Sequence, residues 1–162
     1  MYTKILVPVD GSEASMSGLR EALKIVKSQG SKLRILHIVN EFILDYSFSS
    51  GVYAEDVIES LRKGGKSILG KAEAVAQCEG VKPECVLLES IGGRASDLIL
   101  AQASEWSAEL IVMGTHGRRG LARAVMGSDA EGVLRGSSVP VLLVRAGQDS
   151  AAERRTGKAS AA

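Results

Sequence analysis

The chain has 162 residues, of which 45% are hydrophobic and 24% are charged, and this is the size and composition of one globular domain with a buried core. Lys and Arg number 20 and Asp and Glu number 19, so the net charge of +1 excludes a general electrostatic attraction to nucleic acids or anionic membranes. We therefore expect neither as a partner, and any anionic ligand must be held by local groups. The short apolar run that ends at Pro8 lacks the length of a signal-peptide core or a membrane span, which predicts a cytoplasmic protein.

The first half of the chain alternates apolar runs with stretches of helical spacing. Ile5–Val9 is apolar almost throughout, which is typical of a strand that is covered on both faces in a parallel sheet. A helix is predicted from Ser12 to Gly30, because a start signal, apolar residues at helical spacing and a closing glycine follow one another. Leu33–Val39 repeats the apolar run, and Ile58–Val75 again has the spacing of a helix.

The second half of the chain continues this alternation. Cys85–Leu88, Leu110–Met113 and Val141–Val144 are predicted strands, and Ser96–Trp106 and Asp129–Leu134 are predicted helices. Strands separated by helices cannot join as hairpins, and right-handed crossovers place the helices on both faces of the sheet. The predicted fold is a doubly wound, Rossmann-like α/β domain with a five-stranded, mainly parallel sheet. In such folds ligands bind beyond the carboxyl ends of the strands.

Two segments depart from this plan. The connection Asn40–Ala54 holds four of the six aromatic residues, and connections of this length are usually functional or disordered. It could form a lid or a partner surface, or its rings could cover one edge of the sheet. From Ala146 onward the sequence has no apolar period, so we expect one domain over residues 1–146 and a disordered tail over 147–162.

Several chemical motifs are absent or incomplete. Gly64–Ser67 resembles the end of a phosphate-binding P-loop, but no strand precedes it and the sequence around it is helical. His37 and His116 are the only histidines, and neither has a second ligand at metal-binding spacing. Cys78 and Cys85 fit no zinc or redox motif, so we expect reduced thiols packed in the interior. No G-x-G-x-x-G follows the first strand and no G-x-S-x-G is present, so we predict no catalytic residues and no metal site in the protein itself.

A glycine pattern follows the fourth predicted strand. Gly114, Gly117, Gly127 and Ser128 are spaced as G-x2-G-x9-G-S. A strand that ends in glycine would let a ligand approach its backbone, and the amides at the start of the following helix would attract phosphate. Ser128 could donate a hydrogen bond to a phosphate or cap that helix. Such glycine turns also serve tight packing alone, and these residues leave both interpretations open.

Asp10 places a carboxylate at the end of the first strand, on the same rim of the predicted sheet. It could accept hydrogen bonds from a ribose or a base, or it could cap the helix that follows.

At this point the sequence resembles the universal stress protein family, from Lys4 to Arg145. The resemblance rests on "KILVPVDGS", "ILHIV", "LIVMGTHGRRG", "MGSDAEGVLR" and "VPVLLVR", in this order along the chain. The intact G-x2-G-x9-G-[S/T] spacing resembles the branch of that family that binds ATP. The resemblance therefore implies an adenine nucleotide, ATP or AMP, as the ligand, with Mg²⁺ possible beside the bound nucleotide.

The resemblance also implies the residues of the site. Asp10 would hydrogen-bond the nucleoside, the backbone of Ile38 would meet the adenine edge, and Gly127 would lie at the phosphates. Asp129 departs from the family, which usually carries a small apolar residue there, and this puts the preference among ATP, ADP and AMP in question. The implied nucleotide-binding residues are Pro8, Val9, Asp10, Ile38, Met113, Gly114, His116, Gly117, Arg118, Gly127, Ser128 and Asp129.

Three functions remain open at the level of the sequence. The first is a stress-response binding or sensing module whose nucleotide alters its interactions with partners. The second is a weak ATPase or nucleotidyl-transfer enzyme, although the chain offers no P-loop lysine and no acidic pair for two metals. The third is a nucleotide-independent chaperone-like dimer. A homodimer through Val139–Val144 is expected because this apolar run is the last strand of the sheet, and family members commonly pair there.

Overall fold

The computed structural model describes residues 1–40, 54–90, 92–115 and 126–146. Within them the chain forms a five-stranded sheet in which all four strand pairs are parallel, so the predicted mainly parallel sheet is confirmed. The strand order is β3-β2-β1-β4-β5. The strands are β1 (Lys4–Pro8), β2 (Lys32–Asn40), β3 (Glu84–Ser90), β4 (Leu110–Gly114) and β5 (Val141–Val144).

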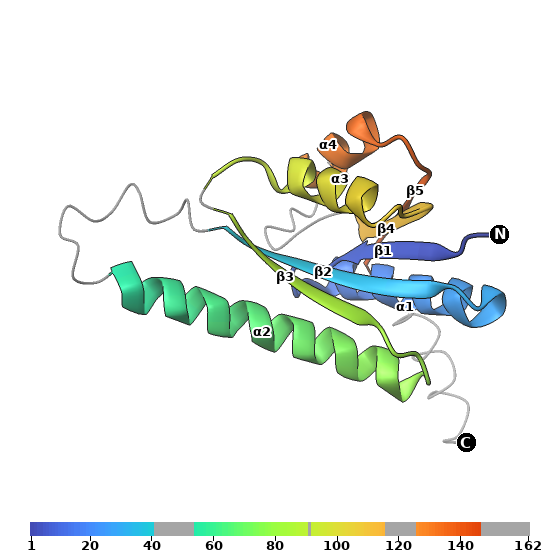
Figure 1. Ribbon diagram of the computed structural model, residues 1–162, viewed down its shortest axis with the longest axis horizontal. Coiled ribbons are helices and arrows are strands. Elements are labelled where there is room, and N and C mark those ends of the chain that lie inside the picture. The colour runs from blue at the N-terminus through green and yellow to red at the C-terminus, as the bar shows by residue number, and fades with distance from the viewer. Residues whose placement is uncertain (41–53, 91, 116–125, 147–162) are drawn as a thin grey trace, which may run out of the picture.

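The helices cover both faces of this sheet. Figure 1 shows α1 and α2 on one face and α3 and α4 on the other, which is the doubly wound arrangement that right-handed crossovers produce. No helix of the described segments is long and apolar enough to cross a membrane. The helices are α1 (Glu13–Gln29), α2 (Ala54–Cys78), α3 (Ala95–Glu105) and α4 (Ser128–Gly136).

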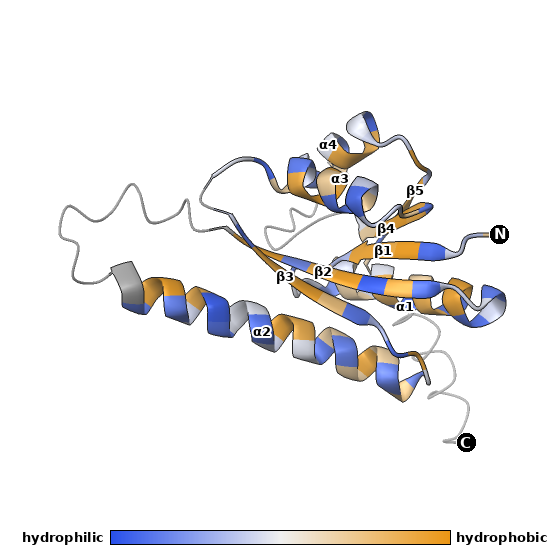
Figure 2. Ribbon diagram, in the orientation of Figure 1, coloured by the Kyte–Doolittle hydropathy of each residue, from blue (hydrophilic) through white to orange (hydrophobic). Residues whose placement is uncertain are grey.

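Two apolar cores, one on each face, hold the layers together. Alternate residues of β1 point to opposite faces: Ile5 and Val7 pack under α1 and α2, and Leu6 packs under α3 and α4. All three side chains have no exposed surface. Figure 2 shows hydrophobic residues along β1, and hydrophobic and hydrophilic residues alternating around α2. Burial on both faces explains why the central strands read as continuous apolar runs in the sequence.

The predicted elements agree with the structure except at their ends. The largest difference is α2, which begins at Ala54 and ends at Cys78 instead of spanning Ile58–Val75. Gly64–Ser67 lies inside this helix, which confirms that it is not a P-loop. The rest of the predicted aromatic connection (41–53) and the predicted tail (147–162) lie outside the described residues.

The expectation of buried thiols is wrong. Cys78 and Cys85 are both free and exposed. Cys78 is the last residue of α2, and Cys85 lies at the start of β3, whose first two residues are exposed.

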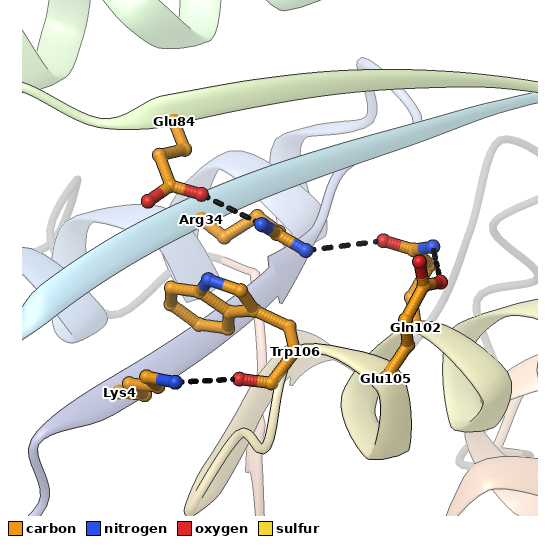
Figure 3. A network of polar contacts seen from close by, with 6 residues as sticks. All are labelled: Lys4, Arg34, Glu84, Gln102, Glu105 and Trp106. Atoms are coloured by element: carbon orange, nitrogen blue, oxygen red, sulfur yellow. Dashed lines mark hydrogen bonds and ion pairs between the residues drawn. The ribbon is translucent and has the colours of Figure 1, made fainter.

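A polar network closes the sheet at the amino ends of its strands. The Trp106 indole lies between two cations, with Lys4 Nζ 5.6 Å and Arg34 Cζ 4.5 Å from the ring centroid (Figure 3). Lys4 Nζ also donates to the Trp106 carbonyl at 2.9 Å, and Arg34 forms an ion pair with Glu84 at 2.7 Å. This end of the sheet is therefore built from side chains that bind one another.

Candidate nucleotide-binding site

The site lies between β1 and β4, where the order in which the chain adds strands to the sheet changes direction. β1 pairs with β2 on one side and with β4 on the other, through the registers Pro8↔Leu36 and Leu6↔Ile111. The crossover that leaves β1 leads to β2 and the crossover that leaves β4 leads to β5, in opposite directions along the sheet, and the carboxyl ends of β1 and β4 are neighbours. This confirms the expectation that Asp10 and Gly114 follow adjacent strands on one rim. Such a reversal leaves the crevice in which open α/β sheets bind ligands.

A tight turn links the end of β1 to α1. Asp10 Oδ1 accepts a hydrogen bond from the Ser12 amide at 2.9 Å, and Gly11 takes the left-handed conformation with φ at 81°. Ser12 is the N-cap of α1, because its hydroxyl accepts from the Ser15 amide at 3.2 Å. The alternative in which Asp10 caps this helix is therefore wrong. The Asp10 carboxylate instead shapes the turn at the rim.

Val9 and Ile38 take different positions at this rim. Val9 is 3% exposed, and its amide donates to the Leu36 carbonyl at 2.8 Å. The Ile38 side chain is half-buried and packs against the α3 and α4 core. The backbone N–H and C=O groups of a strand point alternately to one neighbouring strand and then to the other. Those of Ile38 therefore point toward β1, as the Leu36 carbonyl does, but Ile38 lies past Leu36, the last β2 residue that pairs with β1.

Gly114 has the packing role that the sequence analysis left open as one of two interpretations. A Cβ at this position would lie 2.6 Å from the Ala14 carbonyl carbon and 2.7 Å from the Ser15 amide nitrogen. The first turn of α1 thus rests directly on the end of β4, and Gly18 is similarly close, since a Cβ there would lie 3.2 Å from the Met113 carbonyl carbon. Close contact between helix and strand is thus one reason for a glycine at this position. Met113 itself is 7% exposed and belongs to the α3 and α4 core.

The two ends of the glycine-rich connection are hydrogen-bonded to each other. Thr115 donates its amide to the Val144 carbonyl at 2.9 Å and accepts from the Gly127 amide at 2.9 Å. The chain therefore leaves β4 and returns to the same point of the rim to begin α4. Thr115 carries this closure through its backbone, so no side-chain signal could have identified it. His116, Gly117 and Arg118, which were predicted to line the site, lie outside the described residues.

The start of α4 has no side-chain cap. Its N-cap is Gly127, with φ at −64° and ψ at 147°, and the expectation that Ser128 might cap the helix is wrong because Ser128 is its first residue. The first hydrogen bond of the helix runs from the Glu131 amide to the Gly127 carbonyl at 2.9 Å. The amides before Glu131 therefore have no hydrogen-bond acceptor within the helix. Asp129 and Glu131 lie in the first turn, where their charge stabilises the helix. Free amides and a positive helix end are the features that bind phosphate.

Known proteins share this architecture. A universal stress protein of Methanocaldococcus jannaschii, MJ0531, is 34% identical over 149 residues, which cover 90% of this chain and 83% of that protein. The solved structure of hypothetical protein MJ0577 superimposes with a TM-score of 0.77 at 25% identity, covering 90% of this chain and 96% of that one.

Two further solved structures are complexes with a nucleotide. One is a universal stress protein in complex with cAMP, with a TM-score of 0.67 and 25% identity, and it covers 90% of this chain and 99% of that chain. The other is the universal stress protein from Archaeoglobus fulgidus in complex with dAMP, with a TM-score of 0.61 and 28% identity, covering 88% of this chain and 98% of that chain. The model of the universal stress protein family matches residues 1–145, and the chain belongs to that family.

Proposed function

We propose that this protein binds an adenine nucleotide, ATP or AMP, at the reversal point between β1 and β4, and acts as a binding or sensing module in a stress response. The observation that carries the proposal is the hydrogen bond between Gly127 and Thr115, because it holds the uncapped start of α4 beside the ends of β1 and β4. The family members solved with cAMP and with dAMP support an adenine nucleotide as the ligand class.

The geometry suggests a role for each part of the rim. The Asp10 carboxylate and the backbone of Ile38 would bind the nucleoside from the two neighbouring strands. Pro8, Val9, Met113 and Gly114 would form the floor, since the Val9 amide is already bonded and the Met113 side chain is buried. The Gly127 amide is already bonded to Thr115, so the amides that would hold phosphate begin at Ser128, with Gly127 leaving space beside them and His116, Gly117 and Arg118 completing that end.

Asp129 bears on the metal ion that would accompany the nucleotide. It is exposed in the first turn of α4, close in sequence to the proposed phosphate amides. A carboxylate beside phosphate oxygens can hold Mg²⁺ directly or through water. We therefore assign Mg²⁺ to the bound nucleotide and not to a site of the protein alone.

We also propose a homodimer through Val139–Val144. β5 is an edge strand of the sheet, and all four of its residues are half-buried, so an unpaired ladder and partly exposed apolar side chains lie side by side. Sedimentation at micromolar concentration tests this proposal, which a monomer would contradict.

Native mass spectrometry and calorimetry test the nucleotide proposal. We expect a co-purifying adenine nucleotide, or binding of added ATP or AMP in the micromolar to millimolar range. Absence of both up to millimolar ligand would contradict the proposal and favour the nucleotide-independent dimer. Phosphate release at enzyme-like turnover would instead favour the ATPase or nucleotidyl-transfer alternative.

A further inference from the structure

His37 is a buried polar residue at the edge of the candidate site. It is 5% exposed, and its Nδ1 lies 2.7 Å from the Val9 carbonyl oxygen. Because a carbonyl oxygen can only accept, Nδ1 carries the hydrogen and donates it. The sequence analysis considered this histidine only as a metal ligand, so the contact is visible only in the folded chain.

The contact lies at the point where the β1–β2 pairing stops. The Val9 amide donates to the Leu36 carbonyl at 2.8 Å, which is the last backbone bond of this ladder in the described residues. In a continued parallel ladder the Val9 carbonyl would accept from the amide of Ile38. The imidazole supplies that donor instead. The backbone of Ile38, which points to the β1 side of β2, therefore does not continue this ladder in the described residues.

Helix α2 holds the imidazole in place. A Cβ at Gly65 would lie 3.0 Å from His37 Cδ2, 2.7 Å from Val39 Cγ2 and 2.9 Å from Leu87 Cδ1. The helix backbone therefore lies directly against the ring, and the ring cannot swing toward α2. Gly65 belongs to the Gly64–Ser67 segment that resembled a P-loop, and its purpose is this close approach.

We infer that His37 is a positioning residue of the nucleotide site: its imidazole fixes the Val9 carbonyl, and with it the Asp10 turn and the direction of the Ile38 backbone. This inference rests on the proposed function, because the groups that it positions are those assigned to the nucleoside. It adds a residue that would not touch the ligand.

Three variants separate positioning from a general effect on stability. His37→Leu keeps a similar volume and removes the donor. His37→Asn restores a donor, since its amide nitrogen is two bonds from Cβ, as Nδ1 is in histidine. Ile99→Val is the matched control, because Ile99 is 3% exposed and lies on α3 in the core of the other face. Calorimetry with ATP and with AMP gives the affinities, and urea unfolding gives the stabilities.

We expect His37→Leu to weaken both nucleotides about tenfold and His37→Asn to recover affinity to within about threefold of wild type. Ile99→Val should keep its affinity within about twofold although its urea midpoint falls. Wild-type affinity in folded His37→Leu, or equal losses in the Leu and Asn variants, would overturn the inference. If His37→Leu does not fold, His37→Gln replaces it, because its nitrogen lies one bond too far from Cβ to take the Nδ1 position, and the same loss is expected.

Backbone amide spectra of the ligand-free proteins distinguish failure of this inference from failure of the proposed function. The resonances of Asp10, Gly11 and Ser12 should shift in His37→Leu and return in His37→Asn. If wild type binds no adenine nucleotide, the proposed function is wrong, and these spectra still decide whether His37 positions the turn. If wild type binds but the spectra and affinities do not respond to His37→Leu, only the positioning role is wrong.

Discussion

The polar groups at the two ends of the sheet have different kinds of hydrogen-bond and ionic partners. At the amino ends, side chains satisfy one another: Trp106 lies between Lys4 and Arg34, and Arg34 pairs with Glu84. At the carboxyl ends, the described contacts organise the backbone, through the Gly127 amide on Thr115 and the His37 ring on Val9. At the amino ends the polar side chains bind other side chains of the protein, whereas at the carboxyl ends the contacts hold backbone segments in position. This difference agrees with the proposal that the amino end of the sheet serves stability and the carboxyl end binds the nucleotide.

The largest expected effect is at the amino end. Trp106→Ala should lower the free energy of unfolding by about 2 kcal/mol, because it removes a half-buried indole and both cation contacts on its faces. Urea unfolding measures this loss, and ATP affinity measured in parallel should stay at the wild-type value. Trp106→Phe is the control and should recover part of the stability. A loss of ATP binding free energy as large as the loss of stability would contradict the separate roles of the two ends.

Gly127→Val is the corresponding change at the carboxyl end. We expect ATP affinity to fall about tenfold or more, equivalent to about 1.4 kcal/mol, because the branched side chain would obstruct the amides that lead α4. The fold should persist, since φ of −64° and ψ of 147° suit any residue and require no glycine. Calorimetry and urea unfolding check the two halves of this prediction. Unchanged ATP affinity in the folded variant would count against the site.

Asp129→Asn gives a smaller and more selective effect. If the carboxylate lies about 6 Å from a terminal phosphate charge, it repels that charge by roughly 0.7 kcal/mol at a water-like dielectric constant. The repulsion acts more on ATP than on AMP, so the substitution should raise the ratio of ATP to AMP affinity about threefold in the presence of a chelator. With Mg²⁺ present the change should shrink or reverse. Titrations of both proteins in both conditions test this, and a constant ratio would mean that Asp129 serves only its own helix.

The smallest expected effect is a pH dependence at the amino end. A hydrogen bond from the Thr3 amide to Glu109 at 2.7 Å, followed by one from the Thr3 hydroxyl at 2.8 Å, lowers the pKa of the Glu109 carboxyl. Since the folded pKa is below the unfolded one, the contribution to stability is present above the unfolded value of 4.5 and is lost as the pH falls through the folded pKa. Urea unfolding of wild type and Glu109→Gln should therefore converge as the pH falls from about 6 to about 3. If the stability difference between the two proteins is constant over this pH range, the Thr3–Glu109 hydrogen bonds do not depend on the carboxylate charge.

Much of the fold could be predicted from local patterns. β5 was placed at its observed bounds, and α1 was predicted with both of its caps, Ser12 and Gly30. The start of α2 was missed, because its first turn carries too few apolar residues to show a helical period. For the candidate site, the sequence indicated which strands end in unusual residues, but the roles of Gly114, Thr115 and His37 depend on neighbours that are distant along the chain.

Local sequence patterns were enough to predict the alternation of strands and helices, and hence the fold class, because apolar period, caps and glycines act over a few residues. It also pointed to the rim through Asp10 and the glycine spacing. Three contacts are visible only in the folded chain: the packing of α1 on Gly114, the hydrogen bond from Gly127 to Thr115, and the hydrogen bond from His37 to Val9. Each of these contacts joins segments whose separation in the chain exceeds any local period, so packing of the layers, and not the local sequence, selects them.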